Sequence, residues 1–381
     1  MPRHISLAAL VPLALAIACG SSNPPPSTES TPSDTRAGRP QVRDSMFRRN
    51  TVIENNRPDV GARAGLLVVA NQEGASATIL DAATLKTVAT VPVGQGPHEV
   101  AISTDGRWAV VTNYGLQGAA GNTLSVIDLA AESPSVVRTI DLGVYQRPHG
   151  AAFVRSGTKL LVTSEVSQRL LLIDFVSGRI DTAMATNARG SHMVTVQRDG
   201  RRAWTSNILD GTVTEYDVDA RTTKRTFAVA PNVEGISATP GGVQVWVGSN
   251  TGKTVTVVNG ADAKVLGTIS GFGLPYRVGV SRTGRSALVS DPSTNRIWIY
   301  DVGTRRQLAQ IDLAAEKGVG TPAAQSAPQG ITFDPIADYA YVTLHGTNQV
   351  VAVDLRTRKV MGFGGVGAGP DGIGYSPHVR R

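Results

Sequence analysis

Three histidines occupy equivalent positions in a repeated pattern within this sequence of 381 residues. His98, His149 and His192 each precede an apolar run typical of a β-strand, and they belong to three consecutive copies of the repeat. Imidazole nitrogens bind divalent transition metals and exchange protons near neutral pH. If the three side chains converge, they predict a site for a divalent metal or for a proton-transfer group.

Further polar residues complete this pattern at the ends of other predicted strands. The strand starts equivalent to the three histidines carry Glu234, Tyr276, Gln329 and Asp371. The ends of the neighbouring strands carry Asn71, Asn113, Glu165, Asn207, Asn250, Asp291 and His345. Together these positions predict a polar ring at one mouth of a channel. The predicted ligand-binding residues are His98, His149, His192, Glu234, Tyr276, Gln329, Asp371 and His345, and the predicted metal ligands are the three histidines.

Two interpretations of this ring stay open. In the first, the three histidines converge on a metal or cofactor. In the second, a wide channel keeps the side chains apart, and the polar, water-filled mouth binds a protein partner or a small ligand. The sequence lacks a Walker phosphate loop, a His-Glu-x-x-His pair, a Gly-x-Ser-x-Gly elbow and a Cys-x-x-Cys-His haem motif. These absences favour a non-enzymatic binding protein, with a metal- or haem-assisted oxidoreductase as the alternative.

The elements that must position the ring are repeated strands. An apolar run ending in Asp or Asn recurs seven times, at intervals of 42 to 53 residues, and ends at Asp81, Asp128, Asp174, Asp217, Asn259, Asp301 and Asp354. A period in this range, with alternating apolar and polar residues and turn dipeptides, is typical of a β-propeller with four strands in each blade. The repeated Asp side chains are expected to cap turns. The sequence therefore predicts an all-β, seven-bladed propeller.

The two ends of the repeat region predict how the ring closes. The first predicted strand, 66–70, is the second strand of a blade, whereas the last, 370–376, is an innermost strand. We therefore expect the N-terminal strands 66–93 to pair with the C-terminal strand 370–376 in one blade, which leaves no open sheet edge. Two insertions, 114–122 and 314–327, are expected to lengthen loops on the same face as the histidines, where binding surfaces are commonly built.

The repeat itself resembles a known family. Val110-Val111-Thr112-Asn113-Tyr114 and the following Thr123–Asp128 are similar to the bacterial and archaeal YVTN β-propeller repeat, as are Tyr341-Val342-Thr343 and Pro97–Gly106. The resemblance covers roughly residues 66–377. It implies a propeller fold, and a function as a binding scaffold, a surface protein or, in some members, a cofactor-carrying enzyme.

The N-terminal segment predicts export and lipid anchoring. Residues 1–18 read as a signal peptide, with a basic start and an apolar run from Ile5 to Ala18. Cys19, the only cysteine, follows Leu15-Ala16-Ile17-Ala18, which resembles a bacterial lipobox. Residues 19–64 are predicted to form a lipid-anchored, disordered tether, 65–377 the propeller, and 378–381 a tail. We therefore expect a cell-envelope lipoprotein on the outer face of the inner membrane or on the outer membrane.

The charge distribution argues against a nucleic-acid partner. The formal net charge of +7 is spread over the tether, the C-terminal arginines and the rest of the chain, with no basic run interleaved with aromatic residues. We expect a monomer that contacts the membrane only through its anchor. Its partner, a protein or a small molecule, is expected on the face that carries the histidines.

Overall fold

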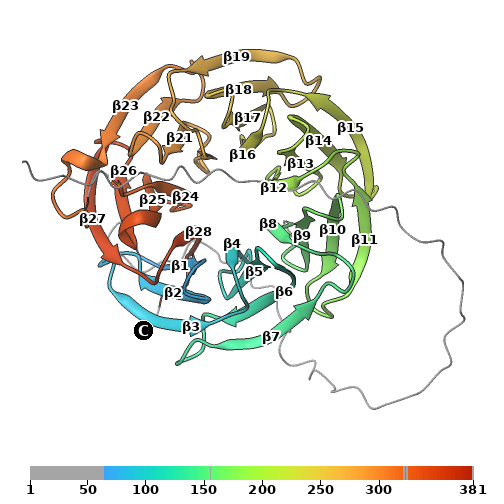
Figure 1. Ribbon diagram of the computed structural model, residues 1–381, viewed down its shortest axis with the longest axis horizontal. Coiled ribbons are helices and arrows are strands. Elements are labelled where there is room, and N and C mark those ends of the chain that lie inside the picture. The colour runs from blue at the N-terminus through green and yellow to red at the C-terminus, as the bar shows by residue number, and fades with distance from the viewer. Residues whose placement is uncertain (1–63, 155, 321, 323–324, 380–381) are drawn as a thin grey trace, which may run out of the picture. The chain divides into compact units, whose positions relative to one another are not determined.

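A ring of seven four-stranded antiparallel sheets forms the core of the protein, as a computed structural model shows (Figure 1). The structure describes residues 64–154, 156–320, 322 and 325–379. The predicted signal peptide, Cys19 and the tether up to residue 63 lie outside the described residues. Among the residues that are described, no helix is long and apolar enough to cross a membrane.

We number the blades I to VII in the order in which the chain builds them, with strands named from the inside outwards. Blade I contains β28 (Pro370–Ser376), β1 (Leu66–Asn71), β2 (Ser76–Asp81) and β3 (Thr87–Pro92). Blade II contains β4 (Pro97–Ile102), β5 (Trp108–Leu116), β6 (Ala119–Asp128) and β7 (Val136–Asp141). Blade III contains β8 (Pro148–Phe153), β9 (Lys159–Ser164), β10 (Arg169–Asp174) and β11 (Ile180–Ala185). Blade IV contains β12 (Ser191–Val196), β13 (Arg202–Asn207), β14 (Thr212–Asp217) and β15 (Thr222–Ala228).

The remaining blades follow the same order. Blade V contains β16 (Val233–Ala238), β17 (Gln244–Ser249), β18 (Thr254–Asn259) and β19 (Val265–Ser270). Blade VI contains β20 (Arg277–Val280), β21 (Ser286–Asp291), β22 (Arg296–Asp301) and β23 (Gln307–Asp312). Blade VII contains β24 (Pro328–Phe333), β25 (Tyr339–Leu344), β26 (Gln349–Asp354) and β27 (Lys359–Gly365). The predicted seven-bladed, all-β fold is confirmed.

Blade I closes the ring by joining the two ends of the described chain. Its innermost strand, β28, pairs antiparallel with β1, so that Leu67 lies opposite Tyr375 and Leu66 opposite Ser376. The two strands lie side by side near the marked C-terminus (Figure 1). The predicted pairing of 66–93 with 370–376 is therefore confirmed, and β28 also contacts the innermost strands of both adjacent blades, β4 and β24.

The hydrophobic core lies between adjacent blades. The second and third strands carry most of the buried residues, as in β1 and β14, whereas outer strands such as β3 and β23 are exposed or half-buried except for one buried residue each. One buried cluster joins Leu66 and Ile79 of blade I to Val111 and Ile127 of blade II. Because every blade packs on two neighbours, all seven depend on the closed ring for burial of their apolar faces.

The repeated Asp residues accept hydrogen bonds from the backbone of the following turn, as the repeat predicts. The Asp81 carboxylate accepts a hydrogen bond from the Thr84 backbone N–H at 2.8 Å, and Asp301 accepts the equivalent bond from Thr304 at 2.7 Å. The repeated Asp side chains therefore cap turns rather than form a site.

The two insertions differ from each other. Residues 114–122 do not form a loop, because β5 and β6 extend through them as a longer hairpin in which Gly115 pairs with Ala120 and Leu116 with Ala119. The segment 314–327 begins in a short 3-10 helix, Leu313–Ala315, and forms no strand in its described residues.

Candidate metal centre

A β-bulge at the start of the inner strand positions the rim residues of six blades. In β4, Pro97 pairs with Asn113 but Val100 pairs with Val111, so that His98 and Glu99 together lie opposite the single residue Thr112. The same shift occurs at the starts of β8, β12, β16, β24 and β28. A bulge re-aims side chains at a strand end, and here it turns two successive residues toward the channel.

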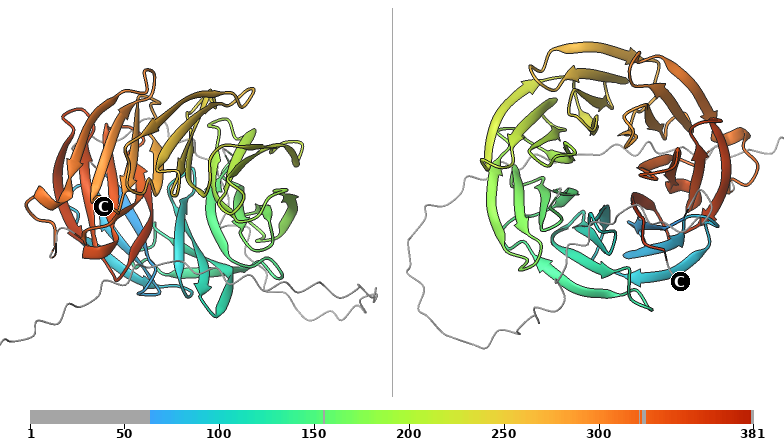
Figure 2. Two further views of the ribbon diagram at one scale, coloured as in Figure 1. Left: turned by 45° about the horizontal axis from the view of Figure 1, so that its top comes forward. Right: turned by 180° about the vertical axis from the view of Figure 1, so that it is seen from behind.

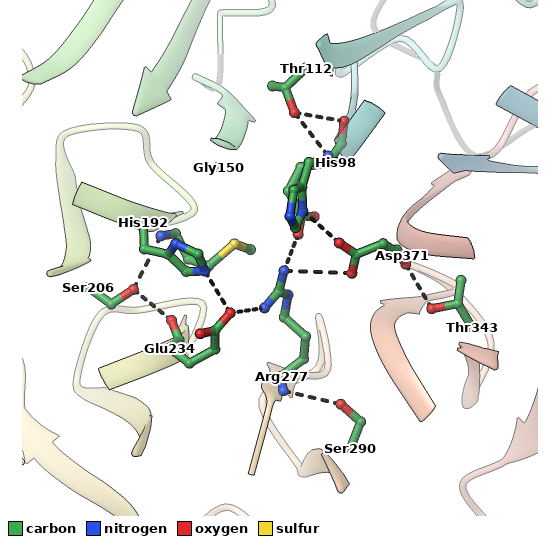
Figure 3. Close-up of polar contacts among 12 residues, drawn as sticks. His98, Thr112, Gly150, His192, Ser206, Glu234, Arg277, Ser290, Thr343 and Asp371 are labelled. Atoms are coloured by element: carbon green, nitrogen blue, oxygen red, sulfur yellow. Dashed lines mark hydrogen bonds and ion pairs between the residues drawn. The ribbon is translucent and has the colours of Figure 1, made fainter. Parts of the chain in front are cut away.

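Hydroxyl side chains fix these bulges and link neighbouring blades. Thr163 Oγ1 accepts a hydrogen bond from the Gly150 N–H at 2.8 Å and lies 2.6 Å from the carbonyl oxygen of His192, to which it donates. Ser206 repeats the arrangement one blade further on, with the Met193 N–H at 3.2 Å and the Glu234 carbonyl at 2.7 Å (Figure 3). The backbone around His192 is thus held by hydroxyls of blades III and IV, and the Glu234 carbonyl is held by blade IV.

The three predicted histidines converge. The ring centroids of His98 and His149 are 4.0 Å apart, and those of His149 and His192 are 3.7 Å apart. Tyr114 packs edge-on against His98 and His149, with centroid distances of 5.2 and 5.5 Å. The interpretation in which a wide channel keeps these side chains apart is therefore wrong.

His149, at the centre of the stack, has no hydrogen-bond partner. Its side chain is completely buried, and neither Nδ1 nor Nε2 has a partner among the described residues. Burial, together with the adjacent His192 and His98, holds the pKa of His149 well below its usual value. His149 is therefore a neutral imidazole with an unshared electron pair in a buried site.

Carboxylates orient the two flanking histidines. His192 Nδ1 lies 3.2 Å from Glu165 Oε2, and its Nε2 lies 2.6 Å from Glu234 Oε1. Burial alone would lower the pKa of His192, but the Glu234 and Glu165 carboxylates outweigh it and raise the pKa to about 10. On the other side of the stack, His98 Nδ1 lies 2.6 Å from Asp371 Oδ2.

Arg277 crosses the channel and joins both sides of the site (Figure 3). Its guanidinium donates to Glu234 and to Glu99 at 2.7 Å each, and lies 3.7 Å from Asp371 Oδ1. Burial would raise the pKa values of Glu234 and Asp371, but His192 or His98, together with Arg277, lowers each to about 2. Burial raises the pKa of Glu99, and Arg277 opposes that shift only in part.

We call this set of eight residues the mouth cluster: His98, Glu99, His149, Glu165, His192, Glu234, Arg277 and Asp371. Within it, His98, Glu99 and His149 each offer a ligand atom within 4.8 Å of the others, and so do His149, Glu165 and His192. Nitrogen and carboxylate donors at this spacing can hold a divalent transition metal after small side-chain movements. The cluster therefore has the composition and burial of a metal centre.

Several predicted rim residues lie outside the mouth cluster. Tyr276 packs beneath the Arg277 guanidinium, at 4.3 Å from its ring centroid. His345 lies in a short 3-10 helix (His345–Thr347), where its Nε2 is 3.7 Å from Glu73, and Gln329 is half-buried in β24. Asn250 reaches the cluster by donating to Glu234 at 3.1 Å. The other strand-end residues bond within their own blade, as Asn71, Asn113 and Asn207 do, or to the connection that enters it, as Asn113 does through the Gly94 N–H and Asp291 through the Gly273 N–H.

Sequence reasoning missed Glu99, Arg277 and Tyr114. Glu99 and Arg277 follow the rim residue directly, at a position where four other blades have glycine: Gly150, Gly235, Gly330 and Gly372. A Cβ at Gly150 would lie 2.7 Å from the Val194 nitrogen, and one at Gly372 would lie 2.3 Å from the His98 carbonyl, so side chains are normally excluded there. A charged residue at a glycine position was the signal that could have found them.

Beyond the mouth cluster the channel continues as a cavity of about 460 Å³. Glu99 and Arg277 form part of its lining, and its walls carry apolar residues of the inner strands, including Val100, Ile236 and Ile331. The mouth cluster therefore separates the histidine side of the channel from a compartment with a mixed polar and apolar lining.

Fold and site together define a seven-bladed β-propeller with a buried histidine–carboxylate cluster. No family model matches the chain, and no curated protein matches it, so the YVTN resemblance stays a prediction. Among solved structures, the chain is similar to a functionally unknown protein from Desulfotomaculum acetoxidans DSM 771, with a TM-score of 0.67 and 14% identity over 82% of this chain and 99% of that one. It is also similar to Kuenenia stuttgartiensis hydrazine synthase, with a TM-score of 0.63 and 18% identity over 80% of this chain and 98% of that one. At these identities the likeness shows the propeller fold alone.

Proposed function

We propose that this protein is a cell-envelope lipoprotein whose propeller binds a transition-metal ion at the channel mouth through His98, His149 and His192. The observation that carries the proposal is His149, which is completely buried and unpartnered between two other imidazoles. Burying a polar group without a partner costs free energy. A metal ion that accepts its electron pair would recover that cost.

The surroundings of the flanking histidines support the same function. A metal-binding histidine commonly presents its second ring nitrogen to a carboxylate, which orients the ring. Asp371 lies beside His98 in this way, and Glu234 beside Nε2 of His192. Glu165 would then exchange its contact with His192 Nδ1 for a shared bond to the ion.

The charges of the mouth cluster favour a cation. Among the residues that the structure describes, Glu99, Glu165, Glu234 and Asp371 face two buried cations, Arg277 and protonated His192. The imidazole-rich donor set favours zinc, copper or nickel over magnesium or calcium, which prefer sites built from oxygen ligands. When bound, such an ion would act as a Lewis acid or a redox centre.

A thermal-shift experiment tests this function. Zinc, copper or nickel added to the metal-free full chain, purified without a polyhistidine tag, should raise the melting temperature, since an ion that binds only the folded state stabilises it by mass action. His149→Leu should abolish the shift, whereas the turn variant Asp217→Asn should keep it. A melting temperature that stays flat with all three metals would refute metal binding.

A second candidate function is the binding of a protein partner at the same face. Leu116, at the end of β5, and Val144 and Val166, in connections next to blade III, lie on the face where the inner strands begin, and 53%, 83% and 57% of their surfaces are exposed. Arg147 ties two of these segments together by donating to the Leu116 carbonyl at 2.8 Å. Replacing Val144 by Asp should weaken partner capture from envelope extracts without changing metal binding. Equal capture by both proteins would contradict this role.

The proposed location depends on Cys19. Replacing Cys19 by Ser should abolish lipid labelling and release the protein from membranes, because the thiol is the only one available for a thioether anchor. The melting temperature of the propeller should not change. Membrane association and labelling that survive in the Ser variant would show that the lipoprotein interpretation is wrong.

A further inference from the structure

We propose that the mouth cluster binds two divalent metal ions bridged by the imidazole of His149. This inference rests on the proposed metal-binding function and adds the number of ions and the ligands of each. The starting point is that the two possible ligand groups overlap in a single residue. His98 and Glu99 form one group with His149, and Glu165 and His192 form the other.

His149 has the properties that a bridging ligand needs. Both of its ring nitrogens are buried and without a partner among the described residues, whereas His98 has a carboxylate at one ring nitrogen and His192 has one at each. The rings of His98 and His192 lie on opposite sides of it, at similar centroid distances of 4.0 and 3.7 Å. His149 has two ring nitrogens, and the bridge assigns one of them to each group.

The ligand count fits two equivalent sites. Each ion would have two imidazole nitrogens and one carboxylate, from Glu99 in one site and from Glu165 in the other. Three protein ligands leave a fourth coordination position open, as is usual in zinc sites that bind a further molecule. Glu99 also lines the channel cavity, so its site adjoins that compartment.

The charge balance also favours two ions over one. With all three histidines neutral, as metal ligands must be, four carboxylates against Arg277 leave three negative charges in the buried cluster. One divalent ion leaves one negative charge, and two leave one positive charge. A neutral imidazole has only one unshared electron pair, so the second ion can bind His149 only when the remaining N–H proton leaves to solvent. The resulting imidazolate bridge brings the cluster with two ions to neutrality, which a buried site favours.

The bridge predicts a defined stoichiometry. The metal-free full chain, purified without a polyhistidine tag, should bind two zinc ions per chain in equilibrium dialysis. One ion per chain would overturn the bridge and leave the proposed function intact. No bound ion would overturn both.

Copper provides a spectroscopic test of the bridge. Two Cu²⁺ ions joined by an imidazolate are magnetically coupled, so the electron paramagnetic resonance spectrum at two equivalents should lose the mononuclear signal. Two uncoupled mononuclear signals would overturn the bridge. This measurement uses the unaltered protein and therefore does not depend on whether any variant folds.

Matched variants separate the two sites. Glu99→Gln and Glu165→Gln each remove one carboxylate with little change in shape, so each variant should bind one ion and show a mononuclear copper signal. A variant that still binds two coupled ions, or a folded variant that binds none, would contradict the assignment of one carboxylate to each site.

Discussion

Two regions of this propeller bury carboxylates among cations, and they do so in opposite ways. The Glu215 cluster, formed by Glu215, Arg202, Lys224 and Arg225 in blade IV, surrounds one fully buried carboxylate with three cations. The Arg202 guanidinium lies 2.7 Å from Oε1 of Glu215, and the Arg225 guanidinium lies 2.6 Å from Oε2 of the same carboxylate. The mouth cluster places four carboxylates around two cations.

The two clusters differ in whether their other polar atoms have hydrogen-bond partners. At the Glu215 cluster, Arg202 and Arg225 also donate to backbone carbonyls of blade V at Gly260, and Arg225 donates to Ala261 at 2.9 Å. These bonds use the donors to join two blades. At the mouth, the ring nitrogens of His149 have no such partner. The Glu215 cluster therefore uses its charged groups to join blades, whereas the mouth cluster leaves both ring nitrogens of His149 without a hydrogen-bond partner among the described residues.

Both clusters depend on the closed ring, and this gives the largest expected effect. Truncation before Pro370 removes β28 from blade I and Asp371 from the mouth cluster. Because all blades pack on their neighbours, the truncated chain should lose cooperative unfolding and both clusters together. Circular dichroism melting would measure this. A truncated protein that melts like the full chain would contradict the closure.

Replacement of Glu215 tests whether stability and metal binding depend on different clusters. Glu215→Ala leaves two half-buried guanidinium groups without their carboxylate, so the free energy of unfolding should fall by about 3–5 kcal/mol. Denaturant unfolding would measure the loss. Metal affinity of the folded fraction should not change. A variant with unaltered stability would show that this cluster is not structural.

The pH dependence of stability should differ between the clusters, because only the mouth cluster contains histidines. Since the pKa of His192 is raised to about 10 in the folded state, its contribution is complete below pH 6.5 and is lost as the pH rises toward 10. The metal-free protein should lose about 1.4 kcal/mol per pH unit in this window. Denaturant unfolding from pH 6 to 10 should show that His192→Gln lacks this loss and that Glu215→Gln retains it. Equal slopes in His192→Gln and the unaltered protein would contradict the ion-pair assignment.

Replacement of His149 should have the smallest effect on the metal-free protein. His149→Leu exchanges an unpartnered polar ring for an apolar side chain, so the stability without metal should stay within about 1 kcal/mol of the original or increase. Denaturant unfolding in the presence of a chelator would measure it. A loss as large as that of Glu215→Ala would show that His149 has a structural role.

The sequence predicted the fold more completely than the site, for a physical reason. Strand positions and the closure of blade I follow from the alternation of apolar and polar residues and from the repeat. Because the repeat recurs in every blade, each copy supports the same prediction. The three histidines were found because they occupy equivalent positions in consecutive blades. Their convergence was not predictable, since it depends on bulges that change side-chain direction within one residue.

The repeat pattern also did not predict the charged contacts across the channel. Arg277 of blade VI reaches Glu99 of blade II, and the two residues are far apart in the sequence. Nothing in the copy of the repeat that contains Arg277 indicates that its side chain contacts Glu99, and nothing in the copy that contains Glu99 indicates a contact with Arg277. The residues that a regular repeat predicts least are those in which one blade departs from the rest, as Glu99 and Arg277 do at a position of glycine.

The most direct test of the central claim is equilibrium dialysis of the metal-free full chain against zinc, compared with His149→Leu under the same conditions. Both proteins should be folded, as checked by circular dichroism, so that any difference reports on the site. We predict that the unaltered protein retains zinc and that His149→Leu retains none. Equal zinc content in the two folded proteins, whether bound or absent, would contradict a metal site centred on His149.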